Sequence, residues 1–420
     1  MDRDRIVDKC TDSVLVKEHP KGIPLLTMHQ SVSLRDPPRH ASRRSPWVGN
    51  VDCPVPFQNG EVKMVSVDGA ATCNPRGFLL PGKHDKRICE MLRKTAHWIL
   101  LWGLFFLICF GLGYPSLNRY DPRLAAGLAD SVEYYKLVEG GPETAEGHHR
   151  YRVLIPYLAR PVYWLAQGQI ETWHPVFFGL LMVNAMFTAT SACLVVLLGY
   201  RALNDYAVAL LGSLLFLLNF NVSNTFLAVG AVDSGEACLI LTTAWAMFTG
   251  RWALLPLIGI AGALAKETFV PLSIVFCVTW LVVITRQEGF RLSRLASVIV
   301  MGVAGLATVT VLQSTISGHI IWPWDIALAE KSDVSPFRAF DEHNLTHGFI
   351  YVFAWLLPLG AWHLRHLPQS WAFASIAAAL AASALGIWVG SVSGVPRAMF
   401  NVAGPVLSIS TASLLMKIRS

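Results

Sequence analysis

Long runs of apolar residues constrain this chain more than any other feature of its sequence. They recur from Thr95 to the end, and several approach the roughly 20 residues that a helix needs to cross about 30 Å of hydrocarbon. They cover residues 96–114, 175–199, 206–220, 235–249, 252–265, 268–285, 296–314, 349–362, 371–391 and 398–416. This pattern predicts an all-α, polytopic transmembrane helical bundle with about ten spans.

The composition agrees with a membrane protein. Hydrophobic residues make up 53% of the 420 residues, charged residues make up 15%, and the mean hydropathy is +0.46. The net charge of +6 comes mostly from residues 1–94, which hold 16 Lys and Arg against 11 Asp and Glu. The remainder is nearly neutral, so we expect no nucleic-acid partner, and the basic segment is interpreted as a cytoplasmic tail.

Two domains are predicted. Residues 1–94 are rich in Pro, Ser, Arg and His and lack the apolar core of a signal peptide, which is typical of a mostly disordered basic extension. Residues 95–420 form the predicted transmembrane domain. The eight cysteines are scattered singly with no CxxC pair, so we expect neither a zinc site nor a disulfide framework.

Basic residues in the short loops predict the orientation. Lys and Arg are enriched in the cytoplasmic loops of membrane proteins, and here they fall on one side of the predicted bundle. The residues concerned are Arg93, Lys94, Arg201, Arg251, Arg286, Arg291, Arg294, Arg365, Lys417 and Arg419. Both termini are therefore predicted to be cytoplasmic. The same topology places 15 of the 17 acidic residues beyond Lys94 on the outer face, so the polar machinery is expected there.

One segment is too long for a single crossing. A continuous helix from Arg251 to Arg286 would measure about 50 Å at 1.5 Å per residue. Two short crossings that turn at Lys266-Glu267 fit the length better, and a re-entrant pair fits equally well. Charges at such a site are costly unless they are paired or face a polar cavity. Mutual neutralisation of Lys266 and Glu267 is the simpler of these two interpretations.

The first outer loop, residues 115–174, is too polar to be a span and carries most of the candidate chemistry. If residues 124–137 are helical, Asp130, Glu133 and Tyr134 share one face. Asp121 precedes Pro122, so it suits a helix N-cap as well as a catalytic role. Asp130 is either a solvated loop carboxylate or a functional one.

The second half of that loop combines basic and apolar residues. Residues 154–165 show the 3.6-residue apolar rhythm of a short interfacial helix. Arg150 and Arg152 lie just before it, on either side of Tyr151. Guanidinium groups in this position either anchor lipid headgroups or clamp a phosphate.

Two further charged residues complete the candidates. Asp233 lies at the predicted outer start of a crossing, where it either caps a helix or contributes to a site. Arg397 is the only basic residue of its short outer loop, against the positive-inside trend, so it is expected to face an anionic ligand.

Together these residues resemble the bacterial members of the GT-C class of integral-membrane glycosyltransferases. The resemblance covers residues 95–416 and rests on the order of five short elements. These are Asp130 with Tyr134, the string Arg152-Val-Leu-Ile-Pro156, Asp233, Ala265-Lys-Glu-Thr268, and Arg397 before the last span.

The resemblance implies transfer of a sugar from a polyprenyl-phosphate donor to an unidentified acceptor, with inversion, on the outer face of the inner (plasma) membrane. It implies that Asp130 is the general base, with Asp121 and Glu133 as substitutes. Cationic side chains would hold the lipid phosphate: Arg150, Arg152, Lys266 and Arg397. A positioned base and fixed positive charge suit this chemistry.

The resemblance to this class is incomplete, and other functions also fit the sequence. No DxD pair occurs in the first loop, so neither a divalent metal nor another cofactor is predicted. The leading alternative is a secondary transporter or lipid flippase, with broken helices around Lys266-Glu267. A membrane scaffold is a third hypothesis, which leaves the outer carboxylates without a role. Neither the sugar nor the acceptor can be inferred from periodicity.

Overall fold

The computed structural model describes residues 83–119, 129–322, 325, 344–389 and 394–419. Every element of regular secondary structure in these ranges is a helix, as the apolar runs predict. Six of these helices are long and apolar enough to cross a membrane. They are α1 (Lys83–Gly113), α4 (Pro175–Leu203), α8 (Phe269–Glu288), α9 (Leu292–Ser317), α13 (Gln369–Val389) and α14 (Val395–Arg419).

Other apolar runs form helices that are too short to cross alone. Helices α5 (Tyr206–Leu217), α6 (Asp233–Phe248) and α7 (Leu255–Ala265) have 12, 16 and 11 residues. At 1.5 Å per residue they measure about 16–24 Å, less than the hydrocarbon thickness. The predicted run 349–362 divides into α11 (Tyr351–Phe353) and α12 (Leu356–His363). The prediction of about ten spans is therefore not confirmed.

Short 3-10 and π helices also occur between the longer helices. They are η1 (Tyr114–Asn118), η3 (Val222–Phe226), η4 (Trp252–Leu254), η6 (Asn344–Ile350) and η7 (Leu364–His366).

Helices α4 and α14 form the centre of the bundle, and α1 and α9 lie at its periphery. The most apolar windows of α4 and α14 are 72% and 67% buried, against 22% and 28% for α1 and α9. Apolar side chains on the outer helices are exposed, such as Leu107 at 67% and Val303 at 60%. So large an exposed apolar surface is unfavourable in water but stable in contact with lipid, which supports a membrane location.

The segment between α1 and α4 forms short helices: α2 (Ala129–Glu139), η2 (Gly147–Tyr151) and α3 (Leu154–Ala166). Helix α3 agrees with the predicted short helix, with Ile155 buried and Leu165 79% exposed. It packs closely on α4 at Gly179, where an added Cβ would lie 2.8 Å from the Ala159 carbonyl oxygen. This contact requires glycine and fixes α3 against the bundle.

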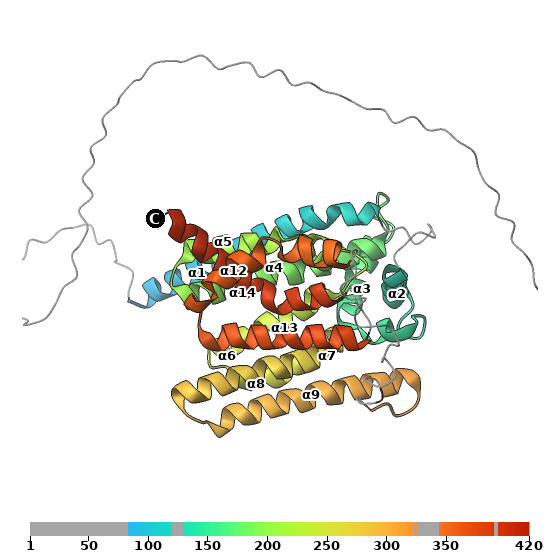
Figure 1. The fold of residues 1–420 in the computed structure, drawn as a ribbon. Coiled ribbons are helices and arrows are strands. Elements are labelled where there is room, and N and C mark those ends of the chain that lie inside the picture. The colour runs from blue at the N-terminus through green and yellow to red at the C-terminus, as the bar shows by residue number, and fades with distance from the viewer. Residues whose placement is uncertain (1–82, 120–128, 323–324, 326–343, 390–393, 420) are drawn as a thin grey trace, which may run out of the picture. The chain divides into compact units, whose positions relative to one another are not determined.

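The bundle has two distinct ends (Figure 1). The start of α1, the α8–α9 turn and the end of α14 lie at the left end in this view, whereas α2 and α3 lie at the right. A hydrogen bond of 3.0 Å between His97 and Tyr206 also joins the middle of α1 to the start of α5. The basic loops are thus collected at the end opposite α2 and α3. Helix α1 begins at Lys83, inside the segment that was predicted to be a disordered extension.

Candidate functional site

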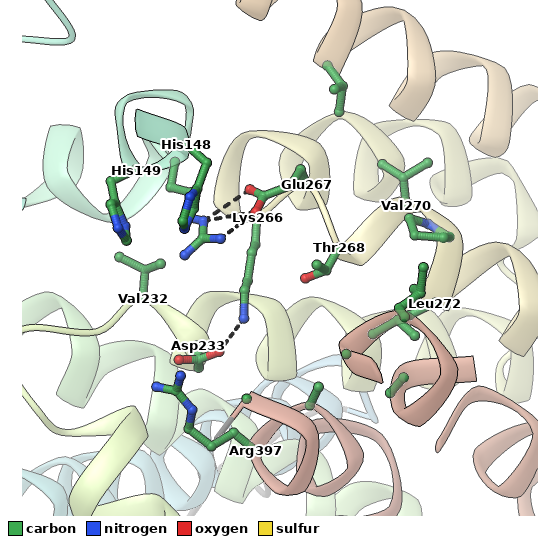
Figure 2. Close-up of a pocket in the computed structure, with 18 of the residues that line it drawn as sticks. His148, His149, Val232, Asp233, Lys266, Glu267, Thr268, Val270, Leu272 and Arg397 are labelled. Atoms are coloured by element: carbon green, nitrogen blue, oxygen red, sulfur yellow. Dashed lines mark hydrogen bonds and ion pairs between the residues drawn. The ribbon is translucent and has the colours of Figure 1, made fainter. Parts of the chain in front are cut away.

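Five segments that are far apart in the sequence meet near the α2–α3 end of the bundle: α2, the η2–α3 connection, the start of α6, the α7–α8 connection and the start of α14. Helix α7 ends where Lys266 becomes extended, with φ −164° and ψ 135°. Helix α8 begins at Phe269 with Pro271 in its first turn, where a missing N–H costs little. The predicted break at Lys266-Glu267 is confirmed, and it leaves two charged side chains between helices (Figure 2).

Arg152 and Glu267 form a buried ion pair across this junction. The Arg152 Nε donates to both carboxylate oxygens of Glu267, at 3.2 and 3.0 Å, and Nη2 donates to Oε1. The side chains are 12% and 15% exposed. Arg152 Nη1 also donates to the Tyr134 hydroxyl oxygen at 3.2 Å. The pair therefore ties η2, α2 and the α7–α8 connection together.

Lys266 bridges two carboxylates at the start of α6. Its Nζ lies 2.5 Å from Asp233 Oδ1 and 3.3 Å from Glu236 Oε2. Glu236 is fully buried and also accepts hydrogen bonds from Thr268 Oγ1 at 2.6 Å and Asn401 Nδ2 at 2.8 Å. This network satisfies each buried charge with an opposite charge or a donor, as burial requires.

These contacts overturn two of the simpler interpretations. Lys266 and Glu267 do not neutralise each other, because each pairs with a residue from another segment. Asp233 does not cap α6, because it is the first helical residue, Val232 is the N-cap, and no side-chain cap bond forms there. Both carboxylates instead point to cations across the junction.

Arg397 is the exception to this pairing. It lies in the first turn of α14, half-buried, and Figure 2 shows its side chain beside Asp233. Within the described part of the chain it has no hydrogen bond and no ion pair within 4 Å, although its charge acts on Asp233. A guanidinium held in this way is available to an anion.

His148 and His149 also line the site, although the sequence analysis assigned them no role. Desolvation at the cavity wall, and then the charge of Arg152, lower the pKa of His148 to about 4. The same two causes lower the pKa of His149. Both rings are therefore neutral at pH 7, and the positive charge of this segment resides on its arginines. In the sequence, the one indication that these histidines belong to the site is their position shortly before Arg152.

One cavity of 670 Å³ joins these groups (Figure 2). Its polar end is lined by Asp130, Tyr134, His148, His149, Arg152, Asp233, Lys266, Glu267, Thr268 and Arg397. Its apolar end is lined by residues of α8, α9 and α13, among them Leu272, Leu306 and Trp388. Leu306 is 40% exposed and Trp388 is 49% exposed, so the apolar end reaches the lipid-facing surface. The cavity fits an amphipathic molecule with a charged head.

Two of the predicted site residues that the structure describes do not line this cavity. Glu133 pairs with Lys136 at 2.8 Å and accepts the Glu146 backbone N–H at 2.5 Å, so it organises the loop. Arg150 donates to Ser317 Oγ at 3.0 Å and thereby pins η2 to the end of α9. Asp121 lies outside the described residues.

Two groups are left to act on a ligand. Asp130, in the first turn of α2, has a 45% exposed side chain, and among the described residues its closest charged contact is His149, with Nε2 3.6 Å from Oδ1. Arg397 is the other. Together they offer a proton acceptor and an anion-binding group. The described residues contain no cluster of three or more His, Cys, Asp or Glu side chains that could hold a metal ion.

Comparison of the chain with known protein families and with curated proteins finds no match.

Proposed function

We propose that this protein is an integral-membrane glycosyltransferase that uses a polyprenyl-phosphate sugar as its donor. The observation that supports this most is the two-part cavity, in which an ionic end and an apolar end share one space. A polyprenyl-phosphate sugar has the same division, with a phosphosugar head on a hydrocarbon chain. In this proposal the segment between α1 and α4 faces the extracytoplasmic side of a plasma membrane, and both termini face the cytoplasm. The chain then crosses the membrane about ten times, with the short helices counted as crossings.

Asp130 is assigned as the general base. Its carboxylate takes the proton of an acceptor hydroxyl while that oxygen bonds to the anomeric carbon. The bond from this carbon to the phosphate oxygen breaks from the opposite face, and its electron pair leaves with the phosphate. The stereochemistry at the anomeric carbon therefore inverts. A half-exposed carboxylate suits this role because it can reach a hydroxyl in the cavity.

Arg397 is assigned to the phosphate. It contributes a charge that no described carboxylate neutralises within ion-pair distance, and a departing phosphate is stabilised by fixed positive charge. Arg152 and Lys266 add to the local potential, while their own hydrogen bonds hold the site together.

The test is transfer by the purified full-length protein in lipid nanodiscs. A panel of polyprenyl-phosphate hexoses and pentoses is supplied as donors, and release of polyprenyl phosphate is measured. We expect turnover in the wild type, loss of at least about a hundredfold in Asp130→Asn, and no change in Glu143→Gln. Glu143 is an exposed carboxylate of the same loop and supplies the matched control. Full turnover in Asp130→Asn would remove Asp130 from the role of base.

The alternative of a secondary transporter or lipid flippase also has a specific observation in its favour. Beyond the broken α7–α8 connection, α14 carries buried polar atoms that lack a hydrogen-bond partner among the described residues: Asn401 Oδ1, Ser408 Oγ and Thr411 Oγ1. Such a row suits a hydrated path. Movement of a labelled polyprenyl-phosphate sugar across liposome membranes, without release of polyprenyl phosphate, would favour this alternative.

A further inference from the structure

His149 places each of its two ring nitrogens against a different partner. Nδ1 lies 3.4 Å from the Tyr134 hydroxyl oxygen, and Nε2 lies 3.6 Å from Asp130 Oδ1. The imidazole also packs edge-on against the Tyr134 ring, with 5.5 Å between centroids. The Tyr134 side chain is fully buried, so the orientation of the imidazole is fixed from that side.

The direction of these hydrogen bonds follows from Arg152. A guanidinium can only donate hydrogen bonds, so Arg152 Nη1 is the donor and the Tyr134 hydroxyl oxygen is the acceptor. The Tyr134 hydroxyl proton then has Nδ1 of His149 as its acceptor. A neutral imidazole that accepts at Nδ1 carries its proton at Nε2, which faces Asp130. The separation of 3.6 Å is long for a hydrogen bond, and such contacts commonly shorten when substrate binds.

The charge state of His149 depends on all the groups around it. Asp130, Glu133 and Tyr134 face it from α2, Glu267 faces it from the α7–α8 connection, and His148 and Arg152 lie on its own segment. Burial and Arg152 lower its pKa more than the carboxylates raise it. A neutral donor orients a carboxylate, whereas an imidazolium would also weaken that carboxylate as a base.

We infer that neutral His149 positions the Asp130 carboxylate through its Nε2–H and leaves the second carboxylate oxygen for the acceptor hydroxyl. This inference rests on the proposed function. His149 acts through Asp130 and is a positioning residue. Sequence analysis could not assign this role, because the hydrogen-bond direction is set by Arg152 and Tyr134 together.

Two substitutions test the inference in the transfer assay. His149→Phe keeps a planar ring against Tyr134 but has no N–H, and His149→Gln restores an N–H near the position of Nε2. We expect kcat to fall about tenfold to a hundredfold in His149→Phe, KM for the donor to change less than about twofold, and His149→Gln to recover most of the loss. His366→Phe, an exposed histidine at the other end of the bundle, provides the control.

The pH profile separates positioning from a structural role. Because the pKa of His149 is lowered, the wild type should lose activity on the acid side below about pH 6.5, as the ring becomes charged. In His149→Gln the part of that limb caused by the imidazole should be absent, because a glutamine side chain does not titrate. A profile in His149→Gln identical to that of the wild type contradicts the inference.

The two proposals fail in different ways. If Asp130→Asn is inactive but His149→Phe keeps wild-type kcat, the positioning role is wrong and the transferase proposal stands. If the wild type releases no polyprenyl phosphate, both proposals are wrong. The tautomer is checked without substrate by ¹⁵N NMR of histidine-labelled protein, with the signal assigned by its loss in His149→Gln. A ring that is charged or protonated at Nδ1 at pH 7 overturns the inference.

Discussion

The Arg152–Glu267 ion pair should contribute strongly to the stability of the bundle. At 3.0 Å, two unit charges attract by about 5 kcal/mol if the effective dielectric constant is about 20. Desolvation of both groups offsets much of this, since the side chains are only 12% and 15% exposed. Removal of one partner should nevertheless cost about 3–5 kcal/mol, because the other charge remains buried and unpaired.

A double-mutant cycle measures the pairwise contribution. Arg152→Met, Glu267→Met and the double variant are compared with the wild type by SDS titration in mixed micelles, with tryptophan fluorescence as the signal. The contact between Arg152 and Tyr134 is lost with and without Glu267, so the cycle largely cancels it. We expect a coupling free energy of about 2–3 kcal/mol.

The chain supplies its own control pair. Arg294 and Glu288 lie 2.8 Å apart at the other end of the bundle, but Glu288 is 46% exposed. The same cycle on this pair should give less than about 1 kcal/mol, as is usual for exposed ion pairs. Equal coupling free energies for the two pairs would refute the argument that burial at the α7–α8 break makes the first pair strong.

Three other experiments test the site, the packing of α3 and the orientation in the membrane. Arg397→Gln should weaken the binding of polyprenyl phosphate by about tenfold or more, since a hydrogen bond to a charged group contributes about 1.5–3 kcal/mol. Arg365→Gln, the control, should leave this affinity unchanged. Both are measured by equilibrium binding in nanodiscs. Gly179→Val should destabilise the protein by about 2 kcal/mol, because the added Cβ meets the α3 backbone. A Cβ at Gly103 meets nothing within 4 Å, so Gly103→Val should destabilise the protein less. The two variants are compared by thermal melting. Orientation is tested with the single-cysteine variants Glu143→Cys and Arg365→Cys, each made in a background without the native cysteines. Membrane-impermeant thiol reagents should label these two cysteines from opposite sides of the bilayer. Labelling of both from the same side contradicts the predicted orientation.

The sequence predicted the helical bundle and the break in it, because both depend on local patterns. Apolar runs report burial or lipid contact directly, and Lys266-Glu267 interrupts them at a place where charge is costly. The number of spans was harder to predict. An apolar run counts residues but not bends, so the run 349–362 was counted as one crossing although it divides into α11 and α12.

The charged residues that line the candidate site were predictable, but its histidines and the pairing of the charges were not. Asp130, Arg152 and Arg397 were selected by position, and they line one cavity. The partner of each charge depends on how α6, α7 and α14 pack, which no sequence spacing specifies. The neutrality of His149 was also hidden, because it arises from burial and from Arg152 rather than from neighbouring sequence alone.

The charge balance of the cavity makes a final prediction about donor and product. A polyprenyl-phosphate sugar is a phosphodiester with one negative charge, which the single charge of Arg397 can match. Release of the sugar leaves a phosphomonoester, whose charge near pH 7 is about −1.5 to −2. The second charge needs another cation, and Lys266 is the nearest candidate, although Asp233 and Glu236 hold it in the free protein.

Product binding should therefore depend on Lys266 more than donor binding does. The double variant Lys266→Gln with Asp233→Asn removes one charge of each sign, so it leaves the net charge of the site unchanged. We expect the Kd for polyprenyl phosphate to rise about tenfold, equivalent to about 1.4 kcal/mol, and the Kd for the donor to change less than about twofold. Equal losses of affinity for donor and product would show that Lys266 does not respond to the added charge, and that Arg397 alone serves both ligands.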